Sequence, residues 1–180
     1  MSLAVQPSMW PLLALRECSP GEAEDLLTRW EQPLGPCNRP FGQQEFVLDI
    51  EGEAVAMATS ASTVSATFGD HPSVADLRRG QVVELARIAR HPKHPFILRV
   101  MLRLWRVYLA HRWPYWPITA AVSYAIPGTT GDLYRFDGWE RVGRCQVSRG
   151  GGTWTKTSPK VSQIADGVKT LWVYRYAEAA

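Results

Sequence analysis

Residues 133–143, LYRFDGWERVG, combine the end of a short helix, a stop signal and the start of a strand. We expect the helix at 132–136. Gly138 ends it, because a residue without Cβ readily adopts the left-handed conformation that follows a helix. Trp139 then leads into a strand at 140–147. A helix and strand joined so tightly predict that both pack against the same sheet.

Strands and helices alternate on both sides of this segment. Ser19, Pro20 and Glu22 form a helix start, with a capping residue, a first-turn proline and a first-turn acid. The resulting order predicts an α/β (α+β) fold with a mixed, mostly antiparallel sheet and helices on both faces, in one domain over residues 1–180. The expected strands are 12–16, 45–50, 54–60, 82–89, 118–125, 140–147, 153–156 and 170–176, and the helices are 20–30, 96–111 and 132–136.

The bulk composition narrows the class of protein. A chain of 180 residues with 46% apolar and 21% charged residues can bury a substantial core and is not expected to be disordered. It begins MSLAVQP, without a basic segment before an apolar core, and lacks the roughly 18 continuous apolar residues of a membrane span. The three cysteines are widely spaced, which suggests reduced thiols. We therefore expect a cytoplasmic protein without a membrane partner.

Positive charge is concentrated in one part of the chain. The net charge is +3, yet residues 78–112 hold nine Lys and Arg residues and a single acid, Glu84. Such a block predicts an anionic partner, either nucleic acid or the phosphates of a nucleotide cofactor. The alternative is a solvated surface that happens to be basic.

The helix expected at 96–111 carries two apolar stripes, with arginines between them. One stripe should pack on the sheet, while the other is covered by long loops or by a second copy of the chain in a homodimer. The first stripe comprises Ile97, Val100, Met101, Leu104 and Tyr108, and the second comprises Leu98, Leu102, Trp105 and Leu109.

The sequence from Tyr134 through Gly138 to Trp139 resembles that of the GNAT family, the acyl-CoA-dependent N-acyltransferases. In that family a short helix ends in Tyr-x-x-x-Gly-aromatic and a strand follows. The resemblance implies that Tyr134 lies beside the thioester sulfur and acts as general acid toward the departing thiolate. The alternative is a plain core tyrosine.

A narrower resemblance is to the Mom family, GNAT-like phage proteins that modify DNA. It is carried by residues 83–87, 123–124, 131–134 and 138–139. The resemblance implies double-stranded DNA as partner, and conversion of the N6 amine of adenine to a carbamoylmethylated form that blocks restriction enzymes. A phage-encoded protein of this kind would act in the host cytoplasm.

One segment departs from the GNAT pattern. GNAT enzymes follow the fourth strand with a glycine-rich turn whose amides bind the CoA pyrophosphate. Here residues 90–96 read RHPKHPF, without glycine, and the two prolines remove two amides. The donor is therefore acetyl-CoA or another activated acyl or amide compound. The candidate donor-binding residues are Arg87, Arg90, Lys93 and Gly131.

Three further residues are candidates for chemistry. Glu84, on an apolar strand, is either a poised base or a structural ion pair. Strand alternation places Arg87 on the opposite face, which argues against a direct pair between the two. Ser123 and Tyr124 end a strand where a GNAT sheet opens, and they have either a site role or simple hydrogen bonds.

Aromatic and basic residues are candidates for contact with nucleic acid. Trp30 and Phe41 could stack on a flipped base. Arg99, Arg103 and Arg106 could follow phosphates, or they are solvated. His91 and His94 have no acid or cysteine nearby to complete a ligand set, so we expect no metal site.

Three functions follow from these observations. The first is a Mom-like DNA transferase, and the second is an ordinary GNAT acetylating a small amine or a protein. The third is a GNAT-shaped binding module without catalysis, which the missing glycines favour.

Overall fold

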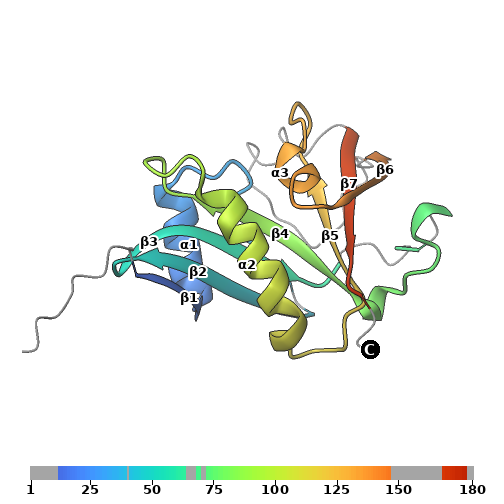
Figure 1. The fold of residues 1–180 in the computed structure, drawn as a ribbon, viewed down its shortest axis with the longest axis horizontal. Coiled ribbons are helices and arrows are strands. Elements are labelled where there is room, and N and C mark those ends of the chain that lie inside the picture. The colour runs from blue at the N-terminus through green and yellow to red at the C-terminus, as the bar shows by residue number, and fades with distance from the viewer. Residues whose placement is uncertain (1–11, 40, 64–67, 70–71, 147–167, 178–180) are drawn as a thin grey trace, which may run out of the picture.

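The computed structural model describes residues 12–39, 41–63, 68–69, 72–146 and 168–177 (Figure 1). The expected strand at 153–156 lies outside the described residues. In chain order the elements are β1 (Leu13–Cys18), α1 (Pro20–Arg29), β2 (Gln43–Ile50), β3 (Glu53–Ala61), η1 (Pro72–Val74), η2 (Arg79–Gln81), β4 (Val82–Arg90), α2 (Ile97–Arg112), β5 (Ala120–Ala125), α3 (Asp132–Arg135), β6 (Glu140–Gln146) and β7 (Val168–Arg175).

The strands form one seven-stranded sheet in the order β1-β2-β3-β4-β5-β7-β6. β4 and β5 are parallel, and the other neighbouring strands are antiparallel. The expected mixed, mostly antiparallel sheet is confirmed, with strand ends shifted by at most two residues. The parallel pair requires a crossover between its strands, and α2 provides it.

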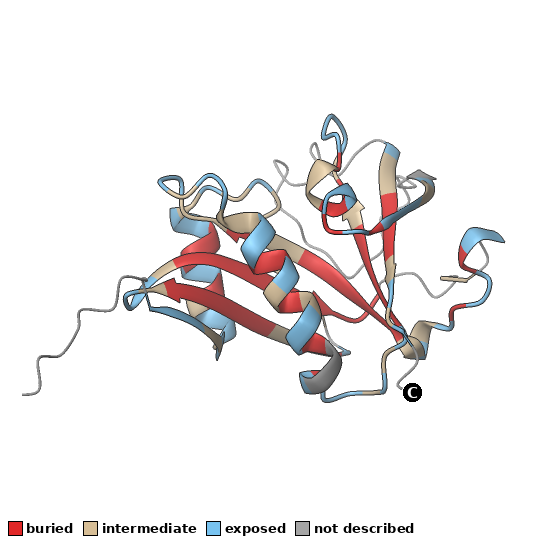
Figure 2. Ribbon diagram, in the orientation of Figure 1, coloured by how far each residue is buried: buried red, intermediate tan, exposed pale blue. Residues whose placement is uncertain are grey.

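The two longer helices cover opposite faces of the sheet. On α1, Ala23, Leu26 and Leu27 pack against Val47 and Met57. The α2 helix packs on the other face, where neighbouring positions of the same strands point. Figure 2 shows α2 with buried residues toward the sheet and exposed residues away from it.

The two apolar stripes of α2 have different surroundings. Leu102, Trp105 and Leu109 of the second stripe are fully buried against the sheet. Of the first stripe, Met101 is fully buried, whereas Val100 and Tyr108 are exposed. The second stripe is therefore the one that packs on the sheet.

The helix starts and stops follow the expected chemistry. Ser19 Oγ accepts a hydrogen bond from the backbone N–H of Glu22 at 3.2 Å, as expected for an N-cap. The Glu22 carboxylate instead forms an ion pair with Arg16, so only half of a capping box is present. Gly138 has a φ of 81° and ends the short helix α3, as predicted. Among the described residues, no helix is long and apolar enough to cross a membrane.

Candidate active site

β4 and β5 begin side by side and then separate (Figure 1). Their pairing covers only three residues on each strand, from Val82 opposite Ala120 to Glu84 opposite Val122. Beyond that point a cavity of about 300 Å³ opens between residues 85–88, 123–126 and 129–134, with Gln32 and Leu34 at its rim. We call this cavity the β4–β5 cleft.

A chain of hydroxyl groups spans the cleft where the strands separate. Ser123 Oγ donates to the carbonyl oxygen of Leu85 at 3.0 Å, and the Tyr134 hydroxyl lies 2.9 Å from Ser123 Oγ. Because serine has one hydroxyl proton and gives it to Leu85, the Tyr134 O–H is the donor between the two. Ser123 therefore makes the hydrogen bonds that were one of its two predicted roles, and it also lines the cleft, where a site role stays a prediction.

Tyr134 is held in place by aromatic packing. Its ring stacks on Trp172 at 5.8 Å between centroids and meets the edge of Trp139 at 5.4 Å. Burial raises the pKa of Tyr134, the hydrogen bond between Tyr134 and Ser123 lowers it, and the charge of Glu84 raises it. The net pKa is raised, so the hydroxyl keeps its proton at neutral pH and can act as a donor.

Gly131 has a packing role beside its predicted place in donor binding. Its φ is 71°, and a Cβ at this position would lie 2.5 Å from the Trp172 ring. The residue lines the cleft and allows α3 to approach β7. A glycine is therefore required here to bring Tyr134 to the cleft.

A β-bulge in β4 overturns the expected alternation of Glu84 and Arg87. Opposite β3, Ser60 pairs with Leu85 and Thr59 pairs with Arg87, so Ala86 has no partner. The extra residue shifts the alternation by one position, and Glu84 and Arg87 face the same side of the sheet. The prediction that they point to opposite faces was wrong for this reason.

Glu84 pairs with a residue that the sequence did not reveal. The Arg39 guanidinium lies 3.1 Å from the Glu84 carboxylate, and both side chains are largely buried. Arg87 instead donates to the backbone carbonyls of Leu34, Gly35 and Pro36. Glu84 thus forms the ion pair that was one of its two predicted roles, but with Arg39.

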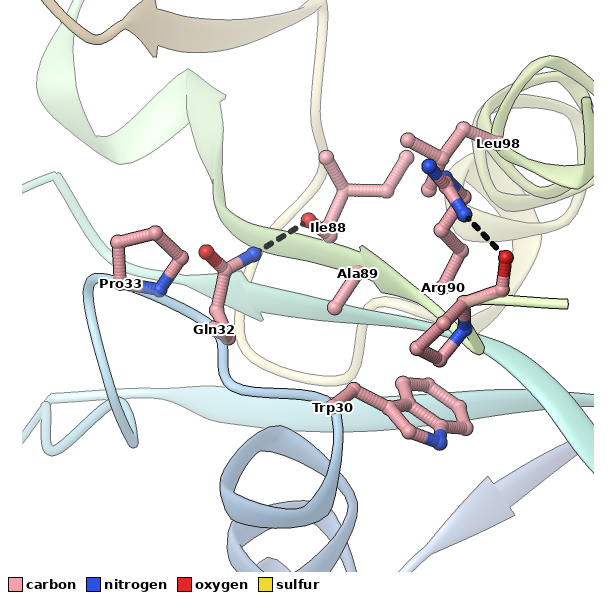
Figure 3. Close-up of a pocket in the computed structure, with 8 residues that line it drawn as sticks. Trp30, Gln32, Pro33, Ile88, Ala89, Arg90 and Leu98 are labelled. Atoms are coloured by element: carbon pink, nitrogen blue, oxygen red, sulfur yellow. Dashed lines mark hydrogen bonds between the residues drawn. The ribbon is translucent and has the colours of Figure 1, made fainter. Parts of the chain in front are cut away.

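The cleft has a different character at its far end, near the turn formed by residues 91–96, which we call the β4–α2 turn. A second cavity of about 280 Å³ lies here, lined mainly by apolar groups such as Trp30, Pro33 and Leu98 (Figure 3). Gln32 lines both cavities, and its amide donates to the Ile88 carbonyl oxygen at 2.9 Å. Gln32 therefore separates the two.

The β4–α2 turn uses its polar groups internally. The amides of His91, Lys93 and His94 donate to Val55 O, His91 Nδ1 and His91 O. The predicted donor-binding residue Arg90 also turns back, because its guanidinium donates to the carbonyls of His91 and Pro92. Lys93 is exposed.

The residues expected to bind nucleic acid are dispersed. Arg106 is 16% exposed, bonds Asp137 at 2.9 Å and Tyr174 at 2.7 Å, and thus joins α2 to α3 and β7. Its expected role on phosphates was wrong, because its guanidinium is occupied within the core. Arg103 also reaches Asp137 but stays exposed, as does Arg99, which lies over the Phe136 ring.

The aromatic candidates also differ from one another. Trp30 packs against the edge of His91 and lines the second cavity, whereas Phe41 is exposed. Tyr124 is half-buried, lines the cleft, and faces the side of the sheet away from α2, against Leu171 and Val173. Within the described parts of the chain, no three His, Cys, Asp or Glu side chains are grouped as a metal site would require.

Comparisons with known proteins identify the fold. No family model and no curated protein sequence matches the chain. Among solved structures, the loading GNATL domain of CurA from Lyngbya majuscula matches with a TM-score of 0.60 and 16% identity, over 91% of this chain and 98% of that one. Arabidopsis thaliana NAA60 in complex with acetyl-CoA matches with a TM-score of 0.59 and 12% identity, over 91% and 98% of the two chains.

A third structure agrees with these. The ribosomal-protein-S18-alanine N-acetyltransferase from Escherichia coli matches with a TM-score of 0.58 and 11% identity, over 94% of this chain and 97% of that one. The chain therefore has the GNAT fold, as expected. The comparisons give no support to the narrower resemblance to the Mom family.

Proposed function

We propose that the protein is an N-acyltransferase that moves an acyl group from a thioester to an amine. The observation that carries the proposal is the Tyr134 hydroxyl, held by Ser123 where β4 and β5 separate. Structural neighbours with this fold include an acetyltransferase from Elizabethkingia anophelis with acetyl-CoA bound. They also include a spermidine N-acetyltransferase from Vibrio cholerae. Amine acylation therefore fits the fold better than the other interpretations.

The near part of the cleft suits the acyl end of a pantetheine thioester. Beyond Glu84, β4 no longer pairs with β5, so a linear arm with amide groups can lie along residues 85–88 in the manner of an added strand. The far part offers the nucleotide half of CoA fewer donors than a glycine-rich turn would, because the β4–α2 turn contains two prolines and bonds the amides of His91, Lys93 and His94.

In the proposed reaction the amine nitrogen attacks the thioester carbonyl carbon, the C–N bond forms and the C–S bond breaks. Tyr134 is the group placed to donate a proton to the departing sulfur, and Ser123 orients its hydroxyl. Glu84 is not among the cleft-lining residues, but its negative charge helps to raise the pKa of Tyr134. Glu84 therefore has no step of its own in the proposed reaction.

The decisive variant is Tyr134→Phe, which removes the hydroxyl and keeps the ring that packs on Trp172. We expect the rate of thiol release from acetyl-pantetheine, measured with a panel of small amines and N-terminal peptides, to fall by about 10²–10⁴. The matched control is Tyr108→Phe, on the exposed side of α2. Equal rates for the two variants would remove Tyr134 from the reaction.

A more specific acceptor, the N6 amine of adenine in DNA, is a second candidate. The exposed Arg99, Arg103 and Phe41 favour it, since cations and an aromatic ring are what a flipped base and its phosphates need. We expect a heavier deoxyadenosine in nucleosides from cells that express the intact protein, and none with Tyr134→Phe. Four standard nucleoside masses in both samples, with folded protein abundant, would exclude DNA as the acceptor.

A further inference from the structure

The far end of the cleft offers a diphosphate few groups. Anions bind at helix starts through free backbone amides. In the β4–α2 turn, two positions are prolines, and the amides of His91, Lys93 and His94 are already bonded within the protein, so the amides that remain are those in the first turn of α2. Of the cations in and beside the turn, Arg90 is bonded to carbonyls of the same turn, and Lys93 is exposed. A donor that delivers its arm from outside this turn would not depend on these groups.

The surface beside the cleft is basic and partly apolar. Phe96 at the start of α2 is 86% exposed, and Phe136 at the end of α3 is 55% exposed. The Arg99 and Arg135 guanidinium groups lie 5.5 and 4.6 Å from the Phe136 ring centroid, so this surface joins α2 to α3. We call it the α2–α3 face, formed by Phe96, Arg99, Arg103, Arg135 and Phe136. Two of its arginines are also paired with acids, Arg103 with Asp137 and Arg135 with Asp132, so Arg99 carries most of its free positive charge.

The position of this face connects it with the donor. The first turn of α2 contributes Leu98 to the far cavity, and α3 contributes Leu133 and Tyr134 to the β4–β5 cleft. The α2 helix contains no acidic residue along its length. A negatively charged body resting on the α2–α3 face would thus lie at the donor side of the cleft.

We propose that the acyl donor is a pantetheine thioester carried on an acidic carrier protein, which docks on the α2–α3 face. The inference rests on the proposed function and names the donor class for the same cleft. The phosphopantetheine arm of such a carrier has one phosphate, bound to the carrier itself, and therefore needs no pyrophosphate site. Opposite charge steers the docking, and the exposed rings suit an apolar strip on a protein helix.

A protein fits this face better than a nucleic acid does. Along α2, the exposed arginines alternate with exposed apolar side chains, among them Val100 one turn after Phe96. Phosphates would leave those apolar groups without a partner, whereas an acidic helix with apolar residues would cover both. In the transfer, the acyl–sulfur bond of the carrier arm breaks and the acyl–nitrogen bond forms. The proton lost by the amine balances the one gained by the thiol.

The test compares three donors that share the same acyl group and sulfur: acetyl-pantetheine, acetyl-CoA and an acetylated bacterial acyl carrier protein. Dissociation constants are measured by isothermal titration with the full chain. We expect the acetylated carrier to bind about tenfold or more tightly than acetyl-CoA, and acetyl-CoA to bind no better than acetyl-pantetheine. Acetyl-CoA binding as tightly as the carrier would overturn the inference and leave the proposed function standing.

Charge reversal at the docking face gives the matched comparison. Arg99→Glu should weaken binding of the acetylated carrier about tenfold and leave acetyl-pantetheine binding unchanged. Arg78→Glu is the control, because Arg78 is also exposed but precedes the opposite end of β4. Equal effects of the two variants would overturn the docking face.

Two other results of the binding measurements would contradict the inference. If none of the three thioesters binds to the folded protein, the proposed function fails together with the inference. If a DNA duplex binds in an Arg99-dependent manner while the carrier binds no better than acetyl-CoA, the face is a nucleic-acid surface and the inference is wrong.

Discussion

The two ends of the free β4 edge differ in how their polar groups are used. At the near end, Tyr134 and Ser123 direct a chain of hydroxyl groups to the Leu85 carbonyl and line an open cavity. At the far end, the β4–α2 turn bonds the amides of His91, Lys93 and His94 within the protein and contributes Pro92 to a second cavity. The two ends therefore offer a ligand different groups: hydroxyls at the near end, and few backbone donors at the far end.

The two ends depend on different parts of the chain. The near end depends on strand divergence and on α3, whereas the far end depends on the residues between β4 and α2. Under the proposed function, the near end receives the thioester and the far end decides what carries it.

The largest expected effect is a loss of stability when Gly131, at the near end of the cleft, is replaced. Gly131→Ala forces a side chain into positive φ and against the Trp172 ring, and we expect a loss of about 2–5 kcal/mol in the free energy of unfolding. Urea denaturation measures the loss. Gly128→Ala is the control: its φ is 82°, but nothing lies within 4 Å of its Cβ, so only about 1–2 kcal/mol should be lost. Similar losses in both variants would show that the approach to Trp172 is not tight.

A smaller effect, on donor binding, is expected at Gln32, which lines both cavities. Gln32→Ala removes the hydrogen bond to Ile88 and frees that carbonyl for a donor arm, at a cost to stability of about 1 kcal/mol. We expect acetyl-pantetheine to bind about fivefold more tightly, a gain of the size of one ordinary hydrogen bond. Titration calorimetry with Gln44→Ala on β2 as control checks this. Unchanged or weaker binding by Gln32→Ala would show that Gln32 does not compete with the donor.

The smallest effect concerns the pKa of Glu45. Its carboxylate accepts a hydrogen bond from Thr59, which pairs with Arg87 beside the bulge. Burial raises the pKa of Glu45 above its ordinary 4.5, although Thr59 and Gln43 donate hydrogen bonds to it. The folded state therefore binds this proton more tightly than the unfolded state, and stability falls as the pH rises from about 4.5 through the folded pKa. The slope for one proton is at most about 1.4 kcal/mol per pH unit.

Glu45→Gln should remove that fall, which denaturation between pH 4 and pH 7 would reveal as a flatter profile than that of the wild type. The exposed Glu53→Gln should keep the wild-type profile. Parallel profiles for the wild type and Glu45→Gln would show that Glu45 is not desolvated.

Local chemistry allowed much of the fold and part of the site to be predicted from sequence. Gly138 acts through its own backbone and Ser19 through its side-chain oxygen on a nearby amide, so the helix ends at these residues could be recognised directly. Tyr134 was found because its spacing from Gly138 and Trp139 resembles the GNAT pattern. The prolines of the β4–α2 turn also indicated the loss of amides that the structure confirms.

The missed residues depend on contacts between distant parts of the chain. Arg39 and Gln32 lie in a Pro- and Gly-rich loop without periodicity, and their partners Glu84 and Ile88 are 45 and 56 positions away. The burial of Arg106 depends on its ion pair with Asp137, and the helical periodicity of α2 does not reveal this partner. The bulge at Ala86 arises from the way β4 pairs with β3, and the sequence of β4 alone does not specify that pairing.

The bulge at Ala86 makes β4 one residue longer than the stretch of β3 that it faces. Leu85 and Arg87 pair with Ser60 and Thr59, which are consecutive in β3, so a strand without Ala86 could keep the same pairing. Deleting Ala86 would close the bulge and leave Arg87 on the side of the Leu34 and Gly35 carbonyls. A deletion elsewhere in β4 has no such outlet and would exchange the faces of the residues beyond it. Ala86 is therefore the position of β4 at which a change in length is expected to be tolerated.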